Sequence, residues 1–209
     1  MSNLFSGLEA FGLGKMSDLD VYASEDKNNK SGEDSAEASE KEKIVEADFL
    51  FDKSYTCPVC EEEFKVKTIK TGKIKLISAD TDLRPKYQNV DSLKYDAVVC
   101  PHCGYSALNR FFNYMTSTQA KLIREQISAS FKGIIEECDE YTYDDAIARH
   151  KLALVNTIVK KSKISECAYT CLKTAWLLRG KAESLPEDTK DYDEQMKQLQ
   201  KEELEFLVN

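Results

Sequence analysis

The chain has 209 residues, a formal net charge of −8 and 32% charged residues. This length suits one or two small domains. The overall acidity argues against a general binder of nucleic acids or anionic membranes, because contacts to phosphate need clustered cations. No apolar stretch approaches the length of a membrane span, and no basic start precedes an apolar core as in a signal peptide. We therefore expect a cytoplasmic protein without membrane contact, whose seven cysteines are reduced thiols.

The N-terminal part divides into an apolar segment, residues 1–22, and a polar acidic tether, residues 23–43. The tether is rich in Ser, Glu, Asp, Lys and Asn and offers almost nothing to bury, which predicts disorder. An apolar segment beyond a flexible tether is typical of a docking segment, either for a groove on a partner or for the protein's own folded part. The residues expected to dock are Leu4, Phe5, Leu8, Phe11 and Leu13.

Two Cys-Pro-x-Cys pairs lie in the middle of the chain, at Cys57 and Cys60 and at Cys100 and Cys103. A Cys-x-x-Cys turn directs two thiolates at one point, and two such turns supply the four sulfur ligands that a tetrahedral Zn²⁺ site prefers. A glycine follows the second pair and can take a positive φ, whereas Glu61 follows the first pair. Four thiolates leave no open position on the metal, so we expect one structural zinc per chain.

Alternatives to this assignment stay open from the sequence. Iron is chemically compatible with four thiolates. A redox dithiol is another use of Cys-x-x-Cys, although such motifs normally come singly on a βαβ fold. His102 lies inside the second pair and is a candidate replacement ligand, whereas His150 fits a packed helix position. The chain carries no P-loop, nucleophile elbow, dinucleotide fingerprint or His-Glu-x-x-His motif, so we expect no enzymatic activity.

The residues around the cysteine pairs, 44–110, have the pattern of a small β module. Residues 64–70 alternate between apolar and basic side chains, a Thr-Gly turn follows, and residues 73–77 alternate again, which predicts a hairpin. Residues 79–93 are expected to form a loop and residues 95–99 a last strand. The hairpin lysines suit an anion or an acidic partner, or they only protect an edge strand from aggregation; they are Lys65, Lys67, Lys70, Lys73 and Lys75.

From Ser106 onward the pattern turns helical, and residues 111–209 are expected to form an all-α domain. Ser117 or Thr118 suits an N-cap, and Gly180 suits a helix end. Helices with small residues at their crossings and large aromatic residues between them are similar to tetratricopeptide hairpins, with about one repeat visible. The expected helices are a first one from Ser106 and then residues 117–131, 143–160, 165–179 and 191–208, with Cys138, Cys167 and Cys171 as ordinary helix residues.

The sequence around the cysteine pairs is distinctive. It runs Tyr-Thr-Cys-Pro-Val-Cys from Tyr55 and Tyr-Asp-Ala-Val-Val-Cys-Pro-His-Cys-Gly-Tyr-Ser-Ala from Tyr95. Together with residues 145–154 and 168–177, these stretches resemble a family of uncharacterised bacterial proteins, common in Firmicutes, with a zinc-ribbon-like region followed by tetratricopeptide-like helices. The likeness covers about residues 44–209. It implies cytoplasmic zinc binding and a helical repeat scaffold, and it implies no reaction.

Taken together, the sequence predicts an α+β protein with three parts. A disordered acidic tether leads into a zinc-ribbon-like β module, residues 44–110, and an all-α, tetratricopeptide-like helical domain, residues 111–209, follows. The expected function is that of a non-enzymatic scaffold that binds a protein partner. A nucleic-acid-binding ribbon that uses the lysine-rich stretch 65–75 is the alternative, and a thiol–disulfide redox protein is a third.

Overall fold

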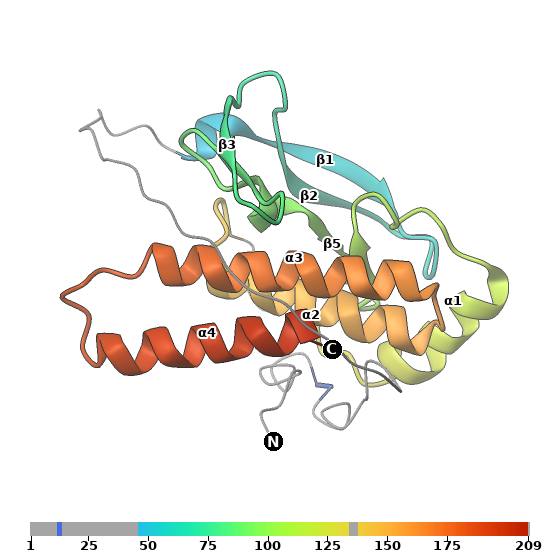
Figure 1. The fold of residues 1–209 in the computed structure, drawn as a ribbon. Helices are drawn as coiled ribbons and strands as arrows, with labels where there is room; N and C mark the ends of the chain where they lie inside the picture. The colour runs from blue at the N-terminus through green and yellow to red at the C-terminus, as the bar shows by residue number, and fades with distance from the viewer. Residues whose placement is uncertain (1–11, 14–45, 134–137, 209) are drawn as a thin grey trace.

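The structure, a computed structural model, describes residues 12–13, 46–133 and 138–208. In Figure 1 the helices α2, α3 and α4 lie side by side, and short paired strands lie on the opposite side of α3 from α4. The described residues thus form an α+β fold with small antiparallel strand pairs and helices. The elements are β1 (Leu50–Thr56), β2 (Glu63–Ile69), β3 (Leu76–Ala79), β4 (Pro85–Tyr87), β5 (Ala97–Val99), β6 (Ser106–Leu108), α1 (Ser117–Ile123), α2 (Tyr143–Val159), α3 (Ile164–Glu183) and α4 (Tyr192–Val208).

Both cysteine pairs form the turns of antiparallel hairpins. β1 pairs with β2 up to Thr56 opposite Glu63, so that residues 57–62, the first knuckle, close this hairpin. β5 pairs with β6 up to Val99 opposite Ser106, so that residues 100–105, the second knuckle, close the other. Two strands therefore position each pair of thiols, one entering and one leaving the turn.

The predicted hairpin of residues 64–70 with residues 73–77 is wrong. β2 is a strand as expected, but its partner is β1. Leu76–Ala79 instead forms β3, which pairs with β4 inside the segment predicted to be a loop. Alternating apolar and polar residues identify a strand but not its partner, and the knuckle turn decides the pairing here. The lysine-rich stretch, residues 65–75, therefore runs from β2 into the connection that precedes β3.

Several helix predictions also need correction. Ser106 does not begin a helix, because Ser106–Leu108 is strand β6. The N-cap of α1 is Thr116, one residue before the expected caps, and a π-helical turn, Arg124–Ser128, continues α1. Gly180 does not end α3, which continues to Glu183. A β-carbon at Gly180 would lie 2.8 Å from the Tyr143 ring, so the glycine allows close packing there. Cys138 lies outside the helices, before α2.

The predictions for α2 and α4 agree with the structure to within one residue at each end. A capping box begins α2: the Thr142 side chain accepts from the Asp145 N–H at 3.2 Å, and the Asp145 carboxylate accepts from the Thr142 N–H at 2.9 Å. α2 packs against α3 and against β5 and β6, and α4 packs against α3. Within the described ranges, no helix is both long and apolar enough to cross a membrane.

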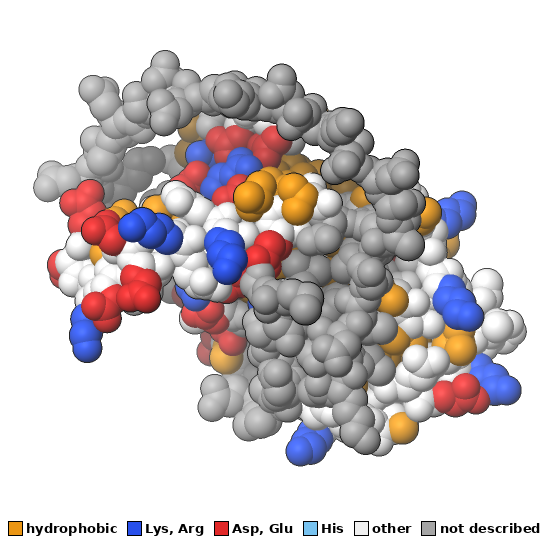
Figure 2. All heavy atoms as spheres, turned by 60° about the horizontal axis from the view of Figure 1, so that its bottom comes forward, with side chains coloured by type: hydrophobic (Ala, Val, Ile, Leu, Met, Phe, Trp, Pro, Cys, Tyr) orange, Lys and Arg blue, Asp and Glu red, His pale blue; other side chains and the backbone are white. Residues whose placement is uncertain are grey.

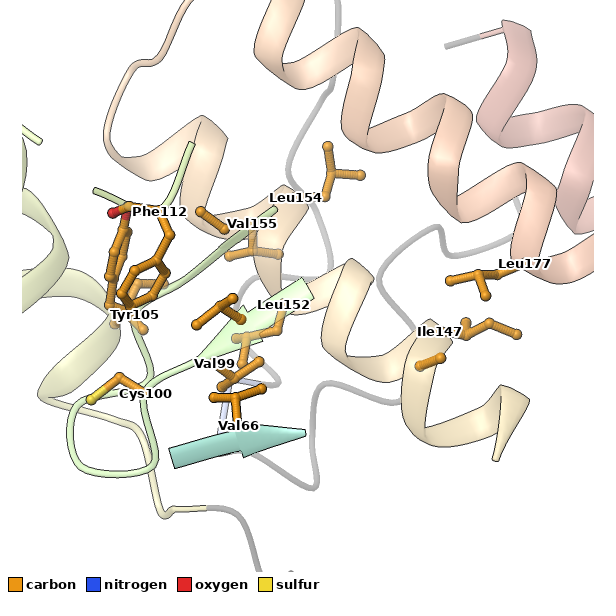
Figure 3. Packing of buried hydrophobic residues seen from close by; sticks show 14 of the residues in the cluster. Val66, Val99, Cys100, Tyr105, Phe112, Ile147, Leu152, Leu154, Val155 and Leu177 are labelled. Carbon is orange, nitrogen blue, oxygen red and sulfur yellow. The ribbon is translucent and has the colours of Figure 1, made fainter. Parts of the chain in front are cut away.

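The larger hydrophobic cluster of the described residues runs without a break from the strands to the helices. In Figure 3, Val66 and Val99 from the strands lie beside Leu152 of α2, and Tyr105 and Phe112 lie next to Cys100. The Tyr105 and Phe112 ring centroids are 5.0 Å apart. Side chains from residues 44–110 and from residues 111–209, which were expected to be two domains, therefore share one core.

Candidate metal centre

The four cysteines expected to bind metal lie together where the two knuckles meet. Their Sγ atoms all lie within 4.8 Å of one another. Cys57 Sγ is 3.6 Å from Cys103 Sγ, and Cys60 Sγ is 3.6 Å from Cys100 Sγ. Four sulfurs bound tetrahedrally at about 2.3 Å from one zinc ion are about 3.8 Å apart. The thiols therefore fit a single metal ion, and three of them are buried while Cys60 is half-buried.

The two knuckles share one backbone design. The N–H of Glu61 donates to Cys57 O at 2.9 Å, and the N–H of Gly104 donates to Cys100 O at 3.1 Å. Both donors have positive φ, 65° at Glu61 and 73° at Gly104. Glu61 thus adopts the same turn as Gly104, and its left-handed backbone conformation costs a free energy on the order of 1 kcal/mol. Gly104 has a second reason to be glycine, because a β-carbon there would lie 2.5 Å from the Phe131 ring.

The electrostatics of the cluster favour a bound cation. Side-chain hydrogen bonds from Cys100 and then Cys103 lower the pKa of Cys57 to about 2. The side-chain hydrogen bonds of Cys103 with Cys100 and Cys57, together with burial, raise the pKa of Cys103 far above that of an ordinary thiol. The cluster therefore accommodates one thiolate and resists a second, because like charges at this distance repel. A coordinated divalent ion removes that resistance, since metal-bound thiols lose their protons.

Side chains from the helical part donate hydrogen bonds to backbone carbonyl groups of both knuckles. Arg124 Nε donates to the first knuckle, at Val59 O, over 3.0 Å. Ser128 Oγ and Asn156 Nδ2 donate to the second knuckle over 2.8 Å and 3.2 Å. These bonds orient the turns that carry the ligands. Sequence analysis missed these residues because their contacts are long-range; the only signal was the polar Asn156 within an apolar stretch of α2.

The five lysines expected to form a charged surface extend from β2 through the following turn to the start of β3. Lys67 pairs with Asp52 at 3.1 Å and with Asp139 at 3.3 Å. Lys70 Nζ donates to a backbone carbonyl at 3.2 Å. The remaining lysines, Lys65, Lys73 and Lys75, are exposed. Internal contacts therefore already engage part of the expected cationic surface.

The structure also locates the histidines and one of the expected docking residues. His102 is exposed and does not belong to the thiol cluster, and His150 is buried on α2. Leu13 is buried. Leu4, Phe5, Leu8 and Phe11 lie outside the described residues, as does the expected tether.

The fold and the site define an α+β protein with a four-cysteine group that is compatible with one metal ion. Residues 50–208 match the family described as "uncharacterized protein conserved in bacteria", DUF2225. This range covers most of the chain and contains all four cysteines, and the chain belongs to this family. No curated protein and no solved structure matches it.

Proposed function

We propose that this protein is a non-enzymatic scaffold of the bacterial cytoplasm, in which one structural Zn²⁺ holds a zinc ribbon against helices that bind a protein partner. The observation that carries the proposal is the thiol cluster, in which four sulfurs at tetrahedral spacing leave no ligand position for a substrate or water. Such a centre stabilises a fold and takes no part in a reaction. Residues Cys57, Cys60, Cys100 and Cys103 would hold the ion.

A contact surface for the partner is suggested by the β3–β4 turn and the end of α4. Leu83 in the turn is 77% exposed and has a φ of 68°, a conformation that costs a leucine on the order of 1 kcal/mol. On α4, Leu204, Leu207 and Val208 are also exposed. We call these four residues the turn–α4 surface. Exposed apolar residues mark an interaction site where they form one contiguous patch.

One guanidinium group on α3 links the two parts of this surface. Arg179 lies 2.9 Å from the Asp82 carboxylate of the turn and 2.7 Å from the Glu203 carboxylate of α4. The indole N–H of Trp176 also donates to Asp82 at 2.9 Å. Both carboxylates are already paired with Arg179, so the proposed contact uses the exposed apolar side chains of the turn–α4 surface. We therefore assign to this surface a protein segment with apolar side chains.

The helical part supports the scaffold assignment in a second way. α2 packs against α3, and α4 packs against α3. We interpret these three helices as a tetratricopeptide-like unit extended by one helix. Figure 2 displays acidic and basic side chains interspersed where α3 and α4 are joined, at the left of the view. A mixed surface of this kind gives no broad positive field for nucleic acid on that face.

Elemental analysis tests the metal assignment, with about one zinc per purified chain as the expected result. Iron in place of zinc, or a reversible disulfide in metal-free protein, would overturn it.

The partner assignment needs matched variants. Leu83→Asp and Leu207→Asp should weaken binding of a purified partner, first identified by cross-linking, about tenfold or more. Tyr114→Asp, at an exposed tyrosine elsewhere, should leave binding unchanged. The nucleic-acid alternative wins instead if the wild type binds RNA or DNA at physiological salt and if Lys73→Ala and Lys75→Ala reduce the salt dependence.

A further inference from the structure

The N-terminal part of the chain reaches the folded core at one described point, the pair Gly12–Leu13. Leu13 is 2% exposed and belongs to the same hydrophobic cluster as the metal-site cysteines. Residues 14–45 separate it from the first strand region. Figure 1 draws the pair as the short blue segment below the helices. A residue buried this far from the rest of the fold in sequence occupies a site that the folded part provides.

The site fits its occupant closely at the backbone. Gly12 has a φ of 82°, and a β-carbon on it would lie 2.2 Å from Ser130 O and 3.0 Å from Lys132 Cγ. Both the backbone conformation and the lack of space therefore require glycine at this position. The fit selects glycine at position 12, next to residues 130–132, and the following leucine lies in the hydrophobic cluster.

The segment that receives the pair, residues 128–133, also rests on the second knuckle. Ser128 Oγ donates to Cys103 O at 2.8 Å. Phe131 packs so closely against Gly104 that no β-carbon fits between them. The receiving segment therefore touches the N-terminal pair through Ser130 and Lys132, and it touches the metal centre through Ser128 and Phe131.

We propose that residues 128–133 form a docking site for the protein's own Gly12–Leu13 pair, and that the metal centre keeps this site in shape. The intervening residues hold the pair close to its site, so an interaction too weak to form between separate molecules persists within one chain. The proposal does not rest on the partner assigned to the turn–α4 surface. It makes the N-terminal segment an intramolecular ligand that loss of metal releases.

Coupling between two sites is reciprocal. If the metal stabilises the receiving segment, docking of Leu13 must also help to retain the metal. Weakening the docked pair should therefore lower the affinity for the metal, although neither Gly12 nor Leu13 is one of the four cysteines. Coupling of the usual size changes the affinity for the metal about fivefold or more.

Two measurements on the full-length, metal-loaded protein test the proposal. In methyl NMR, Leu13 should show contacts to side chains of the hydrophobic cluster and should move to unstructured positions when a chelator removes the metal. Gly12→Ala should release Leu13 and lower the metal affinity, measured by competition with a colorimetric chelator, about fivefold. Gly72→Ala is the matched control, because a β-carbon there meets nothing within 4 Å, and it should change neither signal.

Each other outcome overturns the proposal in a distinct way. An unstructured Leu13 in the loaded wild type excludes docking. Contacts found only between differently labelled chains make the occupant a second copy. Unchanged metal affinity in Gly12→Ala, with Leu13 released, removes the coupling to the metal centre.

Discussion

The strand side and the helix side of this molecule build one core by different means. β1 and β2 have seven residues each, and β3 to β6 have three or four. α2, α3 and α4 have 17, 20 and 17 residues. Isolated two-stranded hairpins are marginal in water, whereas packed amphipathic helices gain stability from the apolar area that they bury. The strand side therefore has more to gain from a cross-link, and the thiol cluster lies where the turns of two hairpins meet.

The two sides nevertheless depend on each other. Arg124, Ser128 and Asn156 come from the helical part and hold carbonyl groups of the knuckles. The hydrophobic cluster also passes between the two sides without interruption. The difference between the two sides predicts that a cross-link stabilises the strands and that buried apolar area stabilises the helices. The contacts between the sides predict that a loss of stability on one side also affects the other. The following experiments separate these statements, beginning with the largest expected effect.

Removing the metal should have the largest effect. Structural zinc in small domains contributes an apparent binding free energy of about 10–16 kcal/mol. Cysteine spacing alone suggests that the ribbon would unfold and leave the helices formed. Because the core is shared, we expect Cys103→Ser or chelation also to lower hydrogen-exchange protection in α2. Cys138→Ser, outside the thiol cluster, is the control. Full protection of α2 without metal would mean that the helices are stable independently of the strand side.

Truncating the helix side should have the next largest effect. Leu154 on α2 is fully buried, and Leu154→Ala should lower the free energy of unfolding by about 2–5 kcal/mol, because it leaves a cavity. Leu204→Ala, at an exposed position of α4, should change it by about 0.5 kcal/mol or less. Urea titration of metal-loaded protein measures both. Equal effects of the two variants would contradict the packing described for α2.

A smaller effect is expected from the link between the sides. Asn156 is fully buried, and its Nδ2 donates to Gly104 O at 3.2 Å and to Leu152 O at 2.9 Å. Asn156→Ala should cost about 1–3 kcal/mol, since buried carbonyl groups lose their donor. It should also speed metal loss, which Leu154→Ala need not do. Gln198→Ala, on an exposed part of α4, is the control. A stability loss without faster metal release would limit Asn156 to helix packing.

The smallest effect should be a pH dependence that originates on α2. Burial lowers the pKa of His150, and the carboxylate of Asp96 partly offsets this effect. Its Nδ1 lies 2.8 Å from Ala146 O. The unfolded chain therefore binds a proton near its ordinary pKa of about 6.5, before the folded chain does. The contribution of neutral, buried His150 to the free energy of unfolding is therefore complete above about pH 6.5. It is lost as the pH falls below this value, by up to about 1.4 kcal/mol per pH unit.

Unfolding at saturating metal between pH 5 and 8 measures this dependence. His150→Leu should flatten the profile relative to the wild type, and His102→Gln, at an exposed position, should not. A profile that His150→Leu leaves unchanged would assign the pH dependence to other groups.

The sequence by itself determined the features that depend on neighbouring residues. Cys-x-x-Cys spacing identified the cysteines that the structure brings together, because both thiols of a pair belong to one turn. Helical periodicity identified α2 and α4, because their apolar positions repeat along one continuous segment. The same local reasoning failed at Gly180, where space beside Tyr143 decides which residue fits.

Tertiary structure decided every feature that needs a distant partner. The strand β2 was predictable, but its pairing with β1 was not, since alternation carries no information about the neighbouring strand. Leu13 was one of several apolar N-terminal residues, and only the folded core provides the place that buries it. Asn156 and Ser128 hold the second cysteine knuckle across long sequence separations. Spacing along the chain fixes local geometry, whereas contacts between distant residues form only once the core has brought them together.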